Sequence, residues 1–148
     1  MSNPIQLPSE VRAALLAKHG RLRIMLAVID RLASEVLAGR KIVTVLEIAV
    51  GNLRDELQIH QEAEERALES VLPTIDAWGP VRSAQMLRQH AAEHAELAAG
   101  LAEARGEALA RAWPTAAARL RKHMDDEERG FLSGEVLRDD VVTVGPTS

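Results

Sequence analysis

Residues 57–71 have the sequence LQIHQEAEERALESV, in which a histidine and a glutamate stand four residues apart within an apolar stripe. Leu57 and Leu68 mark this stripe, which has the spacing of one face of an α-helix. His60 and Glu64 fall on the same face, because residues four apart lie one helical turn above each other. The stretch therefore predicts a helix whose core-facing side has polar residues in its middle.

The remaining histidines follow the same pattern. Residues 123–132 read HMDDEERGFL and resemble HQEAEERALE at 60–69, with histidine and Glu-Glu-Arg at the same offsets. In an antiparallel bundle the second and fourth helices run the same way, so equivalent positions can offer equivalent ligands to one site. All five histidines are thereby used: His19 alone, His60-x-x-x-Glu64, His90-x-x-x-His94 and His123-x-x-x-Glu127.

Apolar periodicity predicts four helical segments. They run from Ser9 to Ala38, from Ile42 to Val71, from Pro80 to Gly106 or Ala112, and from near Pro114 through Phe131 toward Val136. Ser9 is expected to cap the first, Gly39 to end it, and Pro73 to stop the second. Trp78 and Trp113 are expected to plug the ends of the bundle.

Four long amphipathic helices with short connections predict an all-α fold, an up-down-up-down antiparallel four-helix bundle. A chain of 148 residues has the usual size of one domain. We therefore expect a single domain over residues 1–148, with the bundle at about 9–137 and a loosely packed tail at 138–148.

Composition excludes several kinds of function. The chain has no cysteine, which rules out disulfides, thiolate metal sites and cysteine nucleophiles. Its net charge is −4 with both signs mixed, which argues against nucleic acid as a partner. We see no secretory signal and no apolar stretch long enough to span a membrane, so the expected location is the cytoplasm, without a membrane partner.

Seven polar residues fall on the apolar stripes and are the candidate metal ligands. A buried carboxylate without a partner costs several kcal/mol, so this set makes little sense as packing alone. Cations would give each ligand a charge partner, and imidazole with carboxylate suits iron, zinc, copper, nickel or manganese. Neighbouring Glu65, Glu128, Asp125 and Asp126 are expected on solvated faces, or paired with Arg66 and Arg129. The candidates are His19, His60, Glu64, His90, His94, His123 and Glu127.

This constellation, from about Ser9 to Leu137, resembles the hemerythrin-like (HHE) cation-binding domains. The resemblance implies a four-helix bundle with a non-haem di-iron centre, two iron ions that share a bridging oxo or hydroxo group. By this similarity His90, His94 and His123 would hold one iron, and His19 and His60 the other, which keeps a free coordination position. Glu64 and Glu127 would bridge the two ions.

The second bridging position has an alternative. The oxygen carriers of the family place this carboxylate five residues after its histidine, where this chain has Glu128. The repeat with Glu64 and the place of residue 127 on the stripe favour Glu127. The scarcity of aromatic residues, two Trp, one Phe and no Tyr, is a further departure from these carriers, which line their oxygen pocket with bulky rings.

The resemblance implies a protein that binds O₂, or another small diatomic molecule or peroxide, for oxygen or redox sensing, storage or carriage. A second interpretation is a di-iron oxidoreductase acting on peroxide or nitric oxide, or an iron donor for cluster repair. A third is a structural or metal-storage bundle with another metal, such as zinc. A binding protein is favoured over an enzyme, and a sensor would need a homodimer or an unidentified protein partner.

Overall fold

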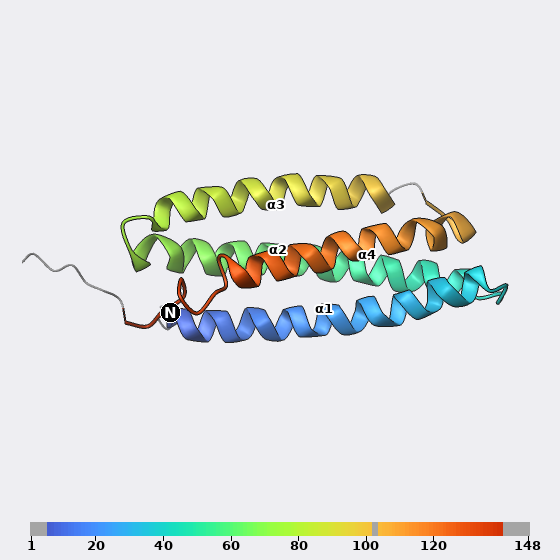
Figure 1. Ribbon diagram of the computed structural model, residues 1–148, viewed down its shortest axis with the longest axis horizontal. Coiled ribbons are helices and arrows are strands. Elements are labelled where there is room, and N and C mark those ends of the chain that lie inside the picture. The colour runs from blue at the N-terminus through green and yellow to red at the C-terminus, as the bar shows by residue number, and fades with distance from the viewer. Residues whose placement is uncertain (1–5, 102–103, 141–148) are drawn as a thin grey trace, which may run out of the picture.

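The computed structural model describes residues 6–101 and 104–140 and has four long helices in this part of the chain. Successive helices run in opposite directions with nearly parallel axes (Figure 1). The predicted all-α, up-down-up-down four-helix bundle is confirmed. None of the described helices is long and apolar enough to cross a membrane. The helices are α1 (Pro8–Leu37), α2 (Val43–Ile75), α3 (Gly79–Leu101) and α4 (Gly106–Arg129).

Two carboxylates, those of Glu10 and Asp139, accept hydrogen bonds from residues at the start of α1. The backbone N–H of Leu7 donates to Glu10 Oε2 at 3.0 Å, and Pro8 occupies the first helical position. Ser9, the predicted cap, lies inside the helix instead. Its N–H and its hydroxyl donate to the Asp139 carboxylate at 2.9 and 2.6 Å, which ties the segment after α4 to the start of α1. Residues 141–148 of the predicted tail lie outside the described part.

Several helix boundaries differ from the prediction. Helix α3 ends at Leu101 rather than at Gly106 or Ala112, and α4 ends at Arg129 rather than beyond Phe131, because Gly130 disfavours helix. Two further differences involve proline. Helix α2 continues through Pro73 to Ile75, and α4 begins at Gly106 with Pro114 in its interior. A proline inside a helix removes one backbone hydrogen bond and costs about 3 kcal/mol. The extra turns bury apolar side chains, each worth about 1.5–3 kcal/mol, which offsets this cost. These side chains are Leu72 and Ile75 in α2 and Leu109 and Trp113 in α4.

The prediction that both tryptophans plug the bundle ends is wrong for Trp78. Trp113 is buried in α4, where its indole N–H donates to Asp30 Oδ1 at 2.7 Å. Trp78 stands in the short turn before α3 and its side chain is 66% exposed. The backbone N–H of Trp78 donates to Asp76 Oδ1, and this turn directs the residue away from the core.

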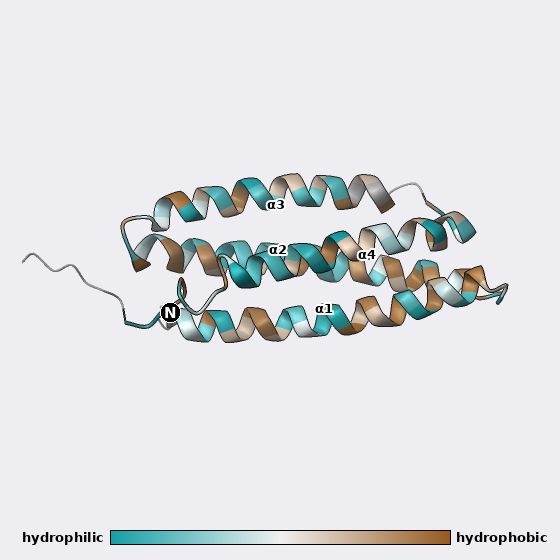
Figure 2. Ribbon diagram, in the orientation of Figure 1, coloured by the Kyte–Doolittle hydropathy of each residue, from teal (hydrophilic) through white to brown (hydrophobic). Residues whose placement is uncertain are grey.

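The interior consists of two separate apolar clusters, and residues of alternating polarity follow every helix (Figure 2). One cluster contains Leu15, Leu68 and Met86, toward the end of the bundle where α1 begins. The other contains Leu22, Leu57 and Leu120, farther along the same helices. In α1 and α2 the candidate ligands lie between these positions, in α3 they follow Met86 and in α4 they follow Leu120. The fold therefore places a polar layer between two apolar cores.

Candidate metal centre

All four helices contribute to this layer, which we call the histidine layer and define as the seven candidate ligands. Helix α1 provides His19, α2 provides His60 and Glu64, α3 provides His90 and His94, and α4 provides His123 and Glu127. His19, Glu64, His90 and Glu127 are buried, and the other three are half-buried. The four-residue spacing places both members of a pair on the same face of their helix. Because these faces point toward the interior of the bundle, residues far apart in the chain meet here.

Six of the seven form two compact groups. The His19 group consists of His19, His60 and Glu64, and the His90 group consists of His90, His123 and Glu127. Within each group, one potential ligand atom per residue lies within 4.8 Å of the others, so each group could hold a metal ion. Three donors from two helices are thereby brought close together in each group.

The two glutamates lie between the groups. Glu64 Oε2 is 2.7 Å from His60 Nε2 and 3.4 Å from His19 Nε2, while its Oε1 is 3.0 Å from His90 Nε2. Glu127 Oε1 contacts His123 Nε2 and is 3.3 Å from His90 Nε2, while its Oε2 is 3.6 Å from His19 Nε2. Each carboxylate therefore directs one oxygen toward each group.

His94 lies beside the His90 group but outside it. Its ring centroid is 6.2 Å from that of His90 and 6.4 Å from that of His123. The side chain lines a cavity of about 660 Å³ bordered by residues of α2 and α3, among them Leu57 and Leu97. Of the seven predicted ligands, His94 is thus the one that the structure places at the edge of the layer.

The donor set fits metal cations. Four buried polar atoms of the layer have no hydrogen-bond partner in the described part of the chain: His60 Nδ1, Glu64 Oε1, His90 Nε2 and Glu127 Oε2. Glu64 Oε1 and His90 Nε2 are close together but not aligned for a hydrogen bond. Buried polar atoms are normally satisfied, because leaving one bare costs about 1–3 kcal/mol. Nitrogen and carboxylate lone pairs that converge in this way are the usual environment of a transition metal ion.

The electrostatics of the layer favour positive partners. Burial disfavours the charged form of His90, but the nearby carboxylates of Glu127 and Glu64 outweigh it and raise the pKa of His90 to about 10. The same balance of burial against Glu64, Glu127 and Glu128 raises the pKa of His19. Burial also opposes ionisation of Glu64, but hydrogen bonds with the surrounding imidazoles hold its pKa well below the usual range. The Glu64 carboxylate therefore stays ionised and attracts protons or metal ions.

His94 behaves differently. Burial and then the charge of neighbouring His90 lower the pKa of His94, so its imidazole is neutral at physiological pH. A neutral imidazole has a free lone pair and needs no deprotonation before it can bind a metal ion.

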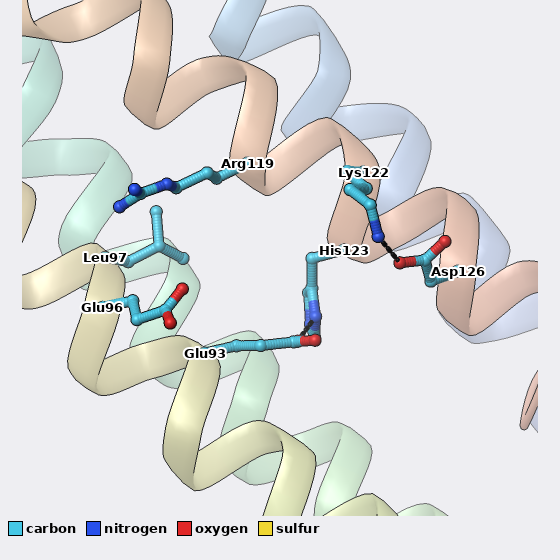
Figure 3. Close-up of a pocket in the computed structure, with 7 residues that line it drawn as sticks. All are labelled: Glu93, Glu96, Leu97, Arg119, Lys122, His123 and Asp126. Atoms are coloured by element: carbon cyan, nitrogen blue, oxygen red, sulfur yellow. Dashed lines mark hydrogen bonds and ion pairs between the residues drawn. The ribbon is translucent and has the colours of Figure 1, made fainter.

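Three carboxylates contact the outer nitrogens of the layer's imidazoles, and the sequence analysis missed this role. Glu128 Oε1 is 3.4 Å from His19 Nδ1, and Glu65 Oε1 is 3.3 Å from His90 Nδ1. Glu93 contacts His123 Nδ1 from α3, beside a small cavity (Figure 3). The expectation that Glu65 and Glu128 face solvent, or pair with Arg66 and Arg129, is therefore wrong.

The other two acidic neighbours behave as surface residues. Asp126 pairs with Arg129 and Lys122, as expected for an exposed helix face, and Asp125 pairs with Arg23. The sequence does contain a signal that separates Glu65 and Glu128 from these surface acids. Both follow an inward-facing glutamate in the two HxxxEE stretches, so they occupy equivalent places in α2 and α4.

Comparison with known proteins agrees with this geometry. The family model described as "Hemerythrin HHE cation binding domain" matches residues 11–133. Neither the curated proteins nor the solved structures gave a significant match. The family match covers all seven residues of the histidine layer and most of the chain. The chain therefore belongs to the hemerythrin HHE cation-binding domain family.

Proposed function

We propose that the histidine layer binds two iron ions and that the pair binds O₂ or a related small molecule, in oxygen or redox sensing, storage or carriage. In this proposal His90, His94 and His123 hold one ion, and His19 and His60 hold the other. Glu64 and Glu127 bridge the ions, together with an oxo or hydroxo group. The observation that carries the proposal is that each of these two carboxylates directs one oxygen to each group.

The number of donors makes the two positions unequal. One ion would be held by three imidazoles and two carboxylate oxygens, and the other by two imidazoles and two carboxylate oxygens. A reduced iron pair supplies electrons and, at the ion with fewer protein ligands, an open coordination position for a small molecule. The protein's part is to hold the donors in place between the two apolar cores.

The surroundings of the two candidate carboxylates on α4 support Glu127 as the bridge. Glu127 is only 5% exposed and faces both groups. Glu128 lies on the outer side of His19, where Arg23 Nη1 and Nη2 donate to its two oxygens at 2.8 and 2.6 Å. A carboxylate held by a guanidinium in this way has few lone pairs left for a metal ion.

One observation favours an oxidoreductase acting on peroxide or nitric oxide as the second candidate. Trp78 is exposed, and Trp113 lies ten residues before His123, about 15 Å along α4. Phe131 packs against the apolar cluster beyond α4. With so few rings to shield a bound ligand, and with a cavity of about 660 Å³ beside His94, water and reductants could reach the site. Such access favours turnover over reversible binding.

The first experiment is metal analysis with an absorption spectrum of the protein purified in air. Two irons per chain with the charge-transfer bands of an oxygen-bridged ferric pair are expected. Zinc in place of iron, or one ion per chain, would overturn the di-iron proposal. Anaerobic reduction followed by O₂ then separates the functions. If removal of O₂ restores the spectrum of the reduced protein, the result supports carriage or storage. Immediate oxidation of the iron pair to the ferric form supports a sensor. Sustained consumption of peroxide in the presence of a reductant supports the enzyme.

A further inference from the structure

The two HxxxEE stretches place a second glutamate at equivalent points of α2 and α4, and both side chains reach the next helix. Glu65 of α2 contacts the Nδ1 atom of His90 on α3. Glu128 of α4 contacts the Nδ1 atom of His19 on α1. In both cases the other ring nitrogen, Nε2, faces Glu64 and Glu127. The repeat in the sequence thus produces a repeated contact behind the layer.

We propose that Glu65 and Glu128 are positioning residues, each accepting a hydrogen bond from the outer nitrogen of an imidazole that binds metal through Nε2. This inference rests on the proposed metal site. A carboxylate on Nδ1 keeps the proton on that atom, so the lone pair is on Nε2, and it also fixes the plane of the ring. Glu65 and Glu128 act through His90 and His19, respectively, and need no contact with the metal.

The two contacts are not equal, because only one carboxylate has a cationic partner. Glu128 shares its charge with Arg23, which donates a hydrogen bond to each of its two oxygens at 2.8 and 2.6 Å. Glu65 accepts a hydrogen bond from the neutral amide of Gln61 at 3.1 Å. No lysine or arginine within the described ranges lies within the 4.0 Å limit of an ion pair with Glu65.

This difference predicts unequal affinities. A carboxylate that shares its charge with a guanidinium is a weaker acceptor, so Glu128 polarises His19 less than Glu65 polarises His90. The His90 group has a further carboxylate, Glu93, behind His123. We therefore expect the His90 group to bind its ion more tightly and to fill first.

Cobalt(II) alone is a suitable probe, because its ligand-field absorption reports on the ligands of each ion. Titration of the metal-free protein against a competing chelator should give two dissociation constants, a tighter and a weaker one. Glu65→Gln should weaken the tighter constant and Glu128→Gln the weaker one, each by about 10–100-fold, with a shifted ligand-field band. Glu62→Gln and Asp126→Asn make the same chemical change at exposed neighbouring positions and should leave both constants unchanged.

The outcomes separate this inference from the proposed function. If the unmodified protein fails to bind two cobalt ions, the metal-site proposal itself is wrong. If it binds two, and both glutamine variants keep its constants and its spectrum, the positioning role is overturned. Two equal dissociation constants in the unmodified protein would overturn the expectation that the His90 group binds its ion more tightly than the His19 group. Urea unfolding of the metal-free variants is the check on folding, and we expect little change because both side chains are about one quarter exposed, 26% and 24%.

Discussion

Glu64→Gln should remove most of the stabilisation that metal ions give to the fold. Glu64 is 1% exposed and its two oxygens lie near imidazoles of α1, α2 and α3. Glutamine keeps the volume of the side chain, so no cavity forms, but it removes the negative charge and one of the two oxygens. Because Glu64 faces both groups, the substitution should weaken the binding of both metal ions.

The size of the effect follows from binding linkage. Metal at a concentration 100 times its dissociation constant stabilises the folded state by about 2.7 kcal/mol per ion. Loss of an outer-shell partner usually weakens metal binding 10–100-fold, and loss of a direct ligand should reach at least the upper value. An increase of about 100-fold in the dissociation constant leaves about 0.4 kcal/mol at the same metal concentration. The loss is about 2.3 kcal/mol per ion, or about 4.6 kcal/mol for both ions, which lowers the thermal midpoint by roughly 9–18 °C for a chain of this size.

The assay compares thermal unfolding with and without metal, so that effects of the substitution on the metal-free fold cancel. Zinc(II) is a convenient ion because it has no redox chemistry. The unmodified protein and Glu62→Gln, a matched exposed control on the same helix, should show the full metal-dependent rise in midpoint. Glu64→Gln should show little of it and retain less metal after dialysis. A Glu64→Gln variant with the full rise and full metal content would refute the assignment of Glu64 as a shared ligand.

Three further predictions concern the fold. Trp113→Ala should lower the free energy of unfolding by about 3–5 kcal/mol in urea titrations, whereas Trp78→Ala, at an exposed position, should change it by less than about 0.5 kcal/mol. Gly51→Ala should raise the thermal midpoint, because its site in α2 has open space and alanine favours helix by roughly 0.5–1 kcal/mol, whereas Gly79→Ala should lower it by placing Cβ against the backbone of α2. The carboxyl pKa of Asp139 is lowered by hydrogen bonds from the first turn of α1, so its stabilising effect is present above pH 3.8 and is lost as the pH falls through the lower pKa of the folded state. Asp139→Asn should therefore reduce the thermal midpoint at neutral pH, and this reduction should become smaller as the pH falls below 3.8. Equal midpoints of the variant and the unmodified protein at neutral pH would contradict this.

The periodicity of apolar residues was enough to predict the four helices, because each stripe keeps the helical spacing on both sides of the polar layer and the turns are short. It failed where a local rule competed with burial. Pro114 is a favourable first residue of a helix, and the prediction began α4 there. The preceding turns contain Leu109 and Trp113, and burying them outweighs the hydrogen bond that Pro114 removes. Sequence alone shows the cost of the proline but not the area that the earlier turns bury.

The same limit applies to the site. Spacing within one helix predicted which residues share a face, and the structure does gather six of the seven candidates into two groups. Spacing could not show what lies behind each imidazole, because those contacts join different helices and depend on how the helices are rotated. Glu65 and Glu128 look like ordinary surface acids in a helical projection, and only the packing of α2 on α3 and of α4 on α1 brings them to His90 and His19. Sequence analysis of such bundles should therefore treat an acidic residue directly after an inward-facing acid as a candidate partner of a histidine on the next helix.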